Sequence, residues 1–199
     1  MSCIVVGTGT GVGKTVACAA LLSRKPTLRY WKPIGTGTPS DSAVIARLCP
    51  NEILPQSYSF TEPQSPHLAA RLDGRRVSVA RLRRDFARHA RQPLLIEGVG
   101  GVLVPLGPIL LIDFLRQLNL PVIVVATSAV GTINHTLLTL EALRARQFTL
   151  AGVILNGPEH RENARAIKKY GKVRILGQLP ILKPLNRAKV ATAGRGIAL

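Results

Sequence analysis

Short, continuously apolar stretches alternate along the chain with longer segments in which apolar residues recur every three to four positions. Such stretches predict strands of a parallel sheet buried on both faces, because these strands have no polar face. We expect strands at residues 3–7, 27–33, 93–98, 121–127, 151–157 and 173–180. The periodic segments predict helices at residues 13–23, 41–49, 78–91, 110–118, 132–147 and 159–170. This alternation predicts a doubly wound α/β fold, with a mostly parallel sheet, helices on both faces and ligands at the carboxyl ends of the strands.

Two serines and one irregular segment add detail to this outline. Ser40 and Ser78 stand where the N-caps of two predicted helices belong. Residues 50–77 are rich in Pro, Gln and Ser, and we expect an irregular excursion there with a short helix near residues 66–72. No internal repeat or linker divides the sequence, so a single domain over residues 1–199 is expected.

The charge of the chain is strongly basic. Lys and Arg number 27 against 10 acids, which gives a formal net charge of +17. Such a surface attracts polyanions at low salt. The basic residues are spread along the chain, however, and their densest cluster, at residues 81–91, has the spacing of one surface helix. Aromatic residues make up only 4%, so we expect a solvated basic surface, and a nucleic-acid partner is the alternative.

Apolar runs and cysteines indicate the compartment. The longest apolar runs, such as residues 120–126, are shorter than the ~20 residues that span a bilayer. The first residues lack a charged leader before an apolar region, so no secretion signal is expected. Cys3, Cys18 and Cys49 show no C-x-x-C spacing, which favours buried, reduced thiols in a cytoplasmic protein. The four histidines are scattered, and no zinc site is expected.

A glycine-rich stretch, GTGTGVGKT at residues 7–15, joins the first strand to the first helix. Its glycines let backbone N–H groups curl around phosphate oxygens at a helix N-terminus. Lys14 can reach the β- and γ-phosphates, and the Thr15 hydroxyl can bind Mg²⁺. This predicts a fold like that of P-loop NTPases; the alternative is a tight turn without a ligand. Five residues separate Gly7 from Gly13, one more than in the usual phosphate-loop pattern.

The scarcity of acids narrows the choice of metal ligands. Glu97 ends a predicted strand, at the edge where a carboxylate facing a metal would lie. Asp41 follows the second strand, although an acid in a first helical turn also stabilises the helix dipole. Asp113 lies inside an apolar helix pattern and is expected to be structural. Thr15, Asp41 and Glu97 are therefore the preferred metal set.

Lys32 closes the second predicted strand. A lysine beside the phosphate loop would place a second cation where charge develops during phosphoryl transfer. The alternative is one more surface lysine in a chain rich in them.

These segments together resemble dethiobiotin synthetase, an ATP-dependent carboxylase of biotin synthesis. The blocks that carry the resemblance run in the family's order over nearly the whole chain, and the shifted glycine also resembles that family's loop. They are GTGTGVGKT (7–15), WKPIGTG (31–37), SDSAVIARL (40–48), SPHLAA (65–70), EGVGGVLVPL (97–106), GTINHTLLTLEAL (131–143) and GVILNG (152–157). The chain departs from the family in a short loop after Pro105, a compact 50–77 region and a C-terminal segment, 183–199, that does not match closely.

The resemblance implies a reaction and its partners. The family converts 7,8-diaminopelargonic acid, CO₂ and ATP with Mg²⁺ into dethiobiotin, ADP and phosphate. One amine captures CO₂ as a carbamate, ATP phosphorylates the carbamate, and the neighbouring amine closes a cyclic urea. The resemblance also implies a homodimer whose substrate site lies at the subunit interface, with neither a membrane nor a nucleic acid as partner.

The resemblance also assigns roles to residues. Lys14, Lys32 and Thr10 would be catalytic, with Thr36 beside the carbamate. The metal would lie on Thr15, Asp41 and Glu97. The nucleotide would contact Gly11, Val12, Gly13, Lys14, Thr15, Val16, Asp41, Glu97, Gly98, Val99, Gly100, Asn156, Gly157, Leu179, Pro180 and Ile181, among which Asn156 would read adenine. Alone, an Asn at a strand end is usually a turn former.

The segment that follows the fourth strand has a physical interpretation of its own. It opens a long helix, so its unpaired N–H groups can receive a carboxylate; the alternative is an ordinary helix start. In the family, this segment binds the substrate's carboxylate from the neighbouring subunit. The residues expected to do so are Gly131, Thr132, Ile133 and Asn134.

Three other classes of protein compete with this interpretation. Partitioning and metal-insertion ATPases carry an additional lysine early in the loop, where this chain has Thr8 and Gly9. Amide-forming synthetases usually add a glutaminase domain, for which 199 residues leave no space. A basic protein that uses ATP as a switch would bind polyanions tightly and hydrolyse ATP without regard to a diamine.

Overall fold

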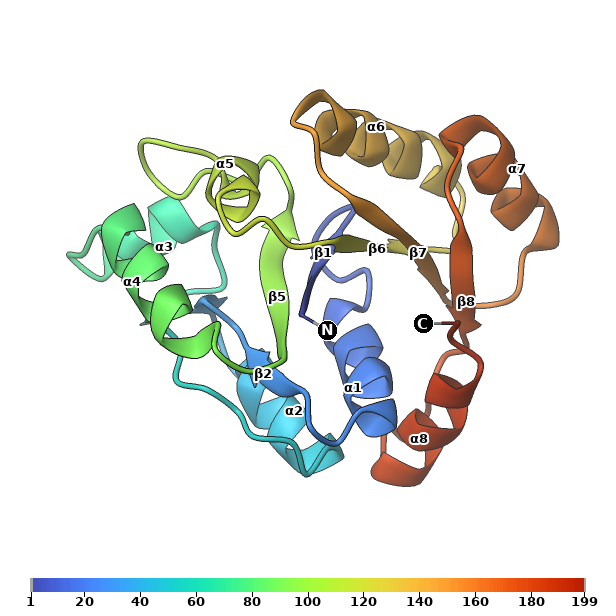
Figure 1. Cartoon of the computed structure of the whole chain (residues 1–199), viewed down its shortest axis with the longest axis horizontal. Coiled ribbons are helices and arrows are strands. Elements are labelled where there is room, and N and C mark those ends of the chain that lie inside the picture. Colours follow the sequence, from blue (N-terminus) through green and yellow to red (C-terminus); the bar gives the residue numbers. More distant parts are fainter. Residues whose placement is uncertain (1, 199) are drawn as a thin grey trace.

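The computed structural model describes residues 2–198, and a six-stranded parallel sheet forms its centre (Figure 1). The strand order is β2-β5-β1-β6-β7-β8. The strands are β1 (Cys3–Gly7), β2 (Arg29–Trp31), β5 (Leu94–Gly101), β6 (Val122–Thr127), β7 (Leu150–Asn156) and β8 (Ile175–Leu179). All six coincide with apolar stretches of the sequence, so the predicted doubly wound α/β fold is confirmed.

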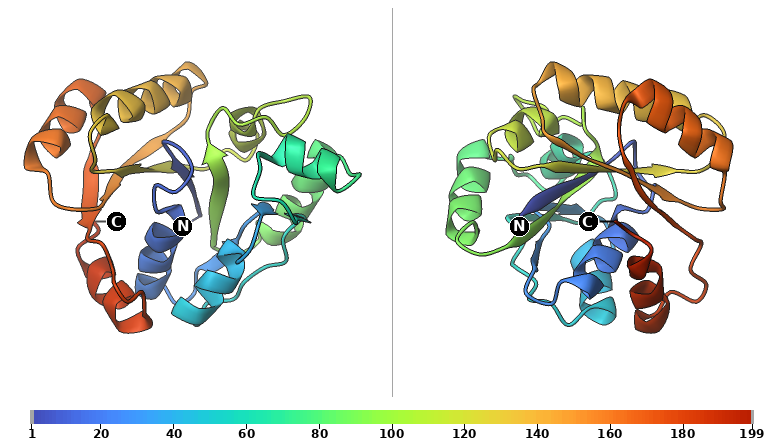
Figure 2. Two further views of the ribbon diagram at one scale, coloured as in Figure 1. Left: turned by 180° about the vertical axis from the view of Figure 1, so that it is seen from behind. Right: turned by 45° about the vertical axis from the view of Figure 1, so that its right-hand side comes forward.

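Helices cover both faces of this sheet (Figures 1 and 2). One face carries α1 (Lys14–Arg24), α2 (Asp41–Leu48) and α8 (Arg187–Arg195). The other face carries α3 (Pro66–Leu72), α4 (Val79–His89), α5 (Leu111–Arg116), α6 (Thr132–Ala145) and α7 (Arg161–Gly171). All but α8 were predicted from the sequence, with ends that agree to within about two residues.

Strand β1 shows why the strands are apolar at every position. Ile4 and Val6 belong to the core under α3–α7, whereas Cys3 and Val5 belong to the core under α1, α2 and α8. Successive side chains of a strand point to opposite faces, and here each face is covered by helices. The alternation of side chains therefore leaves no polar position.

Two strands were missed by the prediction. β3 (Ile34–Thr36) and β4 (Tyr58–Phe60) pair in parallel as a separate two-stranded sheet. The expectation that residues 50–77 are irregular is wrong at β4, whereas the short helix at residues 66–72 is confirmed as α3. Three-residue strands are too short to show alternation, so their pairing depends on the rest of the fold. Helix α8 was missed because its Ala, Gly and Arg residues show little apolar periodicity.

Two helix caps and the contacts of Asp113 agree with local predictions from the sequence. Ser40 Oγ accepts the backbone N–H of Ala43 at 3.2 Å, and Ser78 Oγ accepts that of Arg81 at 3.3 Å. Asp113 has the expected structural role: it accepts the backbone N–H of Leu110 and pairs with Arg146 at 3.1 Å.

Cys3, Cys18 and Cys49 are free and buried, as predicted. Within residues 2–198 we find no helix with the length and apolarity needed to cross a membrane.

The strand register places the phosphate loop next to Glu97. Val5 of β1 pairs with Glu97 of β5, and Gly7, where the loop begins, pairs with Gly101 on one side and with Val125 of β6 on the other. The loop therefore emerges between β5 and β6 at the carboxyl edge of the sheet, where ligands bind in this type of fold.

Candidate active site

The phosphate loop closes around the ammonium group of Lys14. Gly11 and Gly13 have φ angles of +74° and +94°, which residues with a Cβ rarely adopt. The Lys14 Nζ donates hydrogen bonds to the carbonyl of Gly9 at 2.8 Å and to that of Gly100 at 2.9 Å. The loop and the end of β5 thus both bind the Lys14 ammonium group, which lies inside the curl that a triphosphate would occupy.

Gly7 owes its place to packing. A Cβ at this position would lie 2.7 Å from Val12 Cγ2 and 3.1 Å from Lys14 Cδ. The loop folds back over its own start and leaves no room for a side chain. The glycine that stands one position early in the sequence therefore serves close packing under the loop rather than a positive φ angle.

Four polar side chains from four different segments of the chain meet beside this loop. Thr15 Oγ1, at the start of α1, lies 2.7 Å from Asp41 Oδ1 and 3.1 Å from Glu97 Oε1. Lys32 follows β2, and its Nζ lies 2.6 Å from Asp41 Oδ2 and 2.8 Å from Glu97 Oε1. The carbonyl of Gly98 accepts the third Lys32 hydrogen bond at 3.0 Å. The two carboxylates chosen from ten acids thus face one point, together with the predicted hydroxyl and lysine.

The charged groups of this cluster are buried, and their interactions shift one another's pKa values. Lys32 is 2% exposed and Glu97 is 1% exposed. Burial alone would lower the pKa of Lys32, but attraction to Glu97 and Asp41 outweighs it and raises that pKa. Burial would likewise raise the pKa of Asp41, but Lys32 outweighs it and lowers that pKa. The pKa of Lys14 falls to about 8, because burial and the nearby Lys32 charge both disfavour its charged form.

Tyr30 belongs to the same cluster, although the sequence pattern does not single it out. Its hydroxyl donates to Glu97 Oε2 at 2.8 Å, and its side chain is fully buried. Burial and the neighbouring Glu97 charge raise the pKa of Tyr30 well above its ordinary value, so the hydroxyl keeps its proton. In the sequence Tyr30 is one apolar strand residue among others. Only its contact with Glu97 in the folded protein assigns it to the site.

Comparisons with known proteins show the family to which the chain is similar. The model of a protein family described as "AAA domain" matches residues 2–189. The chain is 46% identical to the ATP-dependent dethiobiotin synthetase of Agrobacterium fabrum, over 92% of this chain and 87% of that protein. It is 42% identical to the protein of the same name in Rhodopseudomonas palustris, over 96% of this chain and 92% of that one.

The chain belongs to the dethiobiotin synthetase family. Among solved structures, the septum site-determining protein MinD of Pyrococcus horikoshii, complexed with Mg-ADP, has a TM-score of 0.59. That likeness covers 97% of this chain and 86% of the other at 15% identity. At such an identity it shows a shared P-loop NTPase-like fold and nothing further.

In this member of the dethiobiotin synthetase family, the residues expected around the base lie at the ends of β7 and β8. The backbone N–H of Gly157 donates to the carbonyl of Leu179 at 2.9 Å, which joins the two strand ends. Asn156 Nδ2 donates to the carbonyl of Val12 at 3.1 Å and so ties β7 to the phosphate loop. Leu179 is buried in the core, whereas Ile181 is 61% exposed.

The segment expected to receive the substrate carboxylate opens α6. Gly131 is its N-cap residue, with a φ angle of +87°, and Thr132 is buried. Ile133 is half-buried and Asn134 is exposed at the first turn. The segment's hydrogen bonds connect it with the end of β6, since the Thr132 hydroxyl donates to the carbonyl of Thr127. Thr36 lies elsewhere, half-buried at the end of β3, and Thr10 is exposed on the phosphate loop.

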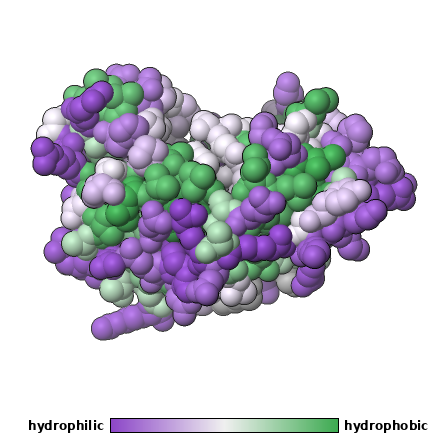
Figure 3. Space-filling model, turned by 90° about the horizontal axis from the view of Figure 1, so that it is seen from above, coloured by the Kyte–Doolittle hydropathy of each residue, from purple (hydrophilic) through white to green (hydrophobic). Residues whose placement is uncertain are grey.

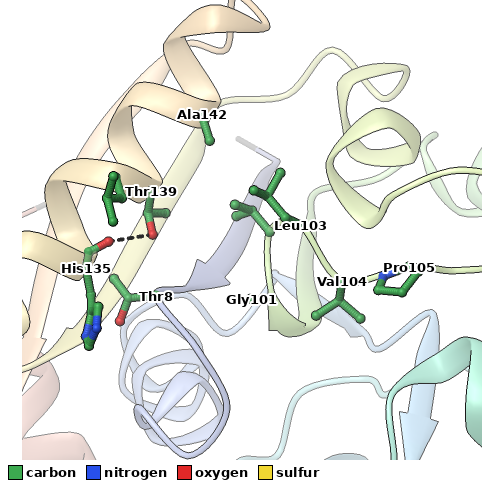
Figure 4. A pocket seen from close by; sticks show the side chains of 10 residues that line it. Thr8, Gly101, Leu103, Val104, Pro105, His135, Thr139 and Ala142 are labelled. Carbon is green, nitrogen blue, oxygen red and sulfur yellow. Dashed lines mark hydrogen bonds between the residues drawn. The ribbon is translucent and has the colours of Figure 1, made fainter.

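A cavity of about 370 Å³ lies between the start of the phosphate loop, the segment after β5 and one face of α6 (Figure 4). Thr8 and the segment Gly101–Pro105 form one side, and His135, Leu138, Thr139 and Ala142 form the other. None of these residues was predicted from the sequence as a site residue. A signal did exist, because positions 135, 138, 139 and 142 follow the spacing of one helix face.

The residues of the cluster fit a magnesium ion. Thr15, Asp41 and Glu97 offer one hydroxyl and two carboxylates, the hard oxygen ligands that Mg²⁺ prefers. Among residues 2–198 there is no group of three or more His, Cys, Asp or Glu that could hold a metal. Mg²⁺ in nucleotide sites usually takes one or two carboxylates and completes its shell with phosphates and water, so this small set suffices.

Proposed function

We propose that this protein uses ATP to join 7,8-diaminopelargonic acid and CO₂ into dethiobiotin, releasing ADP and phosphate, as a cyclo-ligase of biotin synthesis. The observation that carries this proposal is the meeting of Lys14, Lys32, Thr15, Asp41 and Glu97 at the carboxyl edge of the sheet. The 46% identity to a protein named dethiobiotin synthetase, over 92% of the chain, supports it.

The chemistry divides into three steps. An amine of the diamine attacks CO₂, loses a proton and becomes a carbamate. A carbamate oxygen then attacks the γ-phosphorus of ATP, and the bond from that phosphorus to the bridging oxygen breaks to release ADP. The second amine attacks the activated carbonyl carbon, loses a proton, expels phosphate and closes the cyclic urea. No side-chain nucleophile takes part, so positioning and electrostatic stabilisation provide the catalysis.

In these steps we assign the two lysines to different substrates. Lys14 lies inside the phosphate loop and would bind the triphosphate, together with the backbone of Gly11–Val16. Lys32 bridges the carboxylates of Asp41 and Glu97, and would stabilise the negative charge of the carbamate and of its phosphorylated form, with Thr10 and Thr36 beside it. Mg²⁺, held by Thr15, Asp41 and Glu97, would neutralise charge on the phosphates when it is bound.

The base and the substrate tail would occupy the remaining segments. Asn156 and Gly157, with residues 179–181, would form the base site, and residues 98–100 would border the phosphates. The N–H groups at residues 131–134 would receive the substrate carboxylate. The three buried, free thiols fit a reducing compartment, and we place the protein in the cytoplasm.

We further propose that two copies of the chain form a homodimer whose substrate site includes the partner's α6 start. Leu103 and Leu138 border the cavity yet are 51% and 56% exposed, and Val130 beside the α6 start is fully exposed. Hydrophobic patches reach the surface on the side of the molecule that carries α5 and α6 (Figure 3). Apolar surface of this kind is typical of an interface between subunits.

If this face forms the dimer interface, a charge introduced into it should weaken dimerisation. Leu138→Asp is expected to raise the dimer dissociation constant by at least about tenfold, because it would bury an unpaired carboxylate between subunits. Sedimentation velocity over a concentration series measures the shift. Leu72→Asp is the matched control, since Leu72 is 58% exposed on α3 and does not line the cavity. Equal dimerisation of both variants and the wild type would contradict this interface.

The proposed reaction is tested by phosphate release from Mg-ATP with and without diaminopelargonate and bicarbonate. Release is expected to require both co-substrates and to match dethiobiotin formation one to one. In Lys14→Ala, release is expected to fall on the order of 10²–10³-fold, because one preorganised cation at the phosphates is lost. ATP turnover that ignores the diamine, or that nucleic acid stimulates, would overturn the proposal and direct attention to the basic surface.

A further inference from the structure

We infer that Tyr30 is a positioning residue for the metal–nucleotide complex: its hydroxyl fixes the carboxylate of Glu97 in the orientation that faces the metal. The inference rests on the proposed function, because it takes Glu97 as a metal ligand. It adds to that function a residue that touches neither substrate nor metal.

The two oxygens of Glu97 have separate neighbours. Oε1 faces the site, where it meets Lys32 Nζ at 2.8 Å and Thr15 Oγ1 at 3.1 Å. Oε2 accepts the Tyr30 hydroxyl at 2.8 Å. The terminal torsion of a glutamate is broad, so rotation of the carboxylate is decided by its hydrogen bonds. Tyr30 supplies a hydrogen bond to the second oxygen, and this bond restrains the plane of the carboxylate.

Tyr30 itself has little freedom to move. It lies in β2 opposite Leu95 of β5, its backbone N–H donates to the carbonyl of Glu52, and its own carbonyl accepts the N–H of Leu54. Its ring is fully buried in the core under α1, α2 and α8. Because the ring is fixed in the strand, its hydroxyl orients the Glu97 carboxylate, as hydrogen bonds to metal ligands do in metal sites.

The first test is binding of Mn²⁺, used as a spectroscopic probe in the presence of ADP. In Tyr30→Phe the dissociation constant for Mn²⁺, measured by electron paramagnetic resonance, is expected to rise on the order of tenfold. The Mg²⁺ concentration for half-maximal dethiobiotin formation is expected to rise by the same factor. Phenylalanine keeps the buried ring, so packing is preserved while the hydroxyl is lost.

Tyr58→Phe is the matched control. Tyr58 is also buried, but its hydroxyl accepts the backbone N–H of Ser78, at the start of α4. This variant is expected to bind Mn²⁺ as the wild type does. A combined variant, Tyr30→Phe with Glu97→Gln, is expected to bind Mn²⁺ no more weakly than Glu97→Gln alone, because Tyr30 acts through that carboxylate.

The outcomes separate this inference from the proposed function. Unchanged Mn²⁺ affinity in Tyr30→Phe overturns the inference, as does an equal further loss when the substitution is added to Glu97→Gln. If the wild type binds Mn²⁺ with ADP but forms no dethiobiotin, the proposed function fails and the binding comparison still decides the role of Tyr30. If the wild type does not bind Mn²⁺ with ADP, both fail.

Discussion

Replacing Lys32 by alanine is expected to lower the rate of dethiobiotin formation on the order of 10²–10³-fold while ADP binding stays within about threefold of the wild type. The proposed role of Lys32 is to stabilise charge that develops on the carbamate, and loss of one preorganised donor at a reacting group has an effect of this size. Single-turnover formation of dethiobiotin, with the nucleotide saturating, measures the chemical step directly.

The same substitution has a predictable cost to stability. Lys32 separates Asp41 from Glu97, and its removal leaves the buried Glu97 carboxylate without its ammonium partner. Breaking a buried ion pair from one side costs about 3–5 kcal/mol of unfolding free energy.

Two further variants separate chemistry from folding. Lys32→Gln keeps a hydrogen-bond donor and loses the charge, so it is expected to fold better than Lys32→Ala and to be equally slow. Lys168→Ala, which removes an exposed lysine on α7, is expected to behave as the wild type. A rate within about threefold of the wild type in Lys32→Ala would contradict the assigned role, because the loss expected there is far larger.

Gly13→Ala is expected to raise the dissociation constant for ATP about a hundredfold, equivalent to about 3 kcal/mol. Two independent constraints act at this residue. Its φ angle is +94°, and a Cβ would lie only 2.1 Å from the side-chain nitrogen of Asn156. The loop and Asn156 cannot both keep their places, so the amide groups that we propose to bind the phosphates would be displaced. Isothermal titration with ATP or ADP measures the change.

The control for Gly13→Ala is a glycine with strain but without a clash. Gly74 has a φ angle of +64°, and a Cβ at this position would have no other atom within 4 Å. Gly74→Ala is expected to cost roughly 1–2 kcal/mol of stability and to leave ATP affinity unchanged. Equal ATP affinity in Gly13→Ala and the wild type would show that the loop does not bind phosphate as proposed.

Local patterns in the sequence reveal the fold class and the glycine-rich loop. A strand buried on both faces must be apolar at every position, so β1, β5 and β6 are visible without any knowledge of their partners. The loop is equally local, because its glycines, Lys14 and Thr15 all lie within residues 7–15. Because the chain has few acids, Asp41 and Glu97 could be chosen from the sequence, and in the structure both contact Thr15 Oγ1.

Tertiary structure alone decided how the distant residues meet. Strand order β2-β5-β1 brings Tyr30 and Lys32 against Glu97, which lies 65 residues from Lys32 along the chain, and no periodicity encodes that adjacency. The same holds for β3 and β4, which are too short to be recognised without their pairing. Local patterns report which side of an element is buried, whereas the neighbour across a sheet is chosen by packing of the whole chain. The partner of Tyr30, and with it the role that we infer, is therefore visible only in the folded protein.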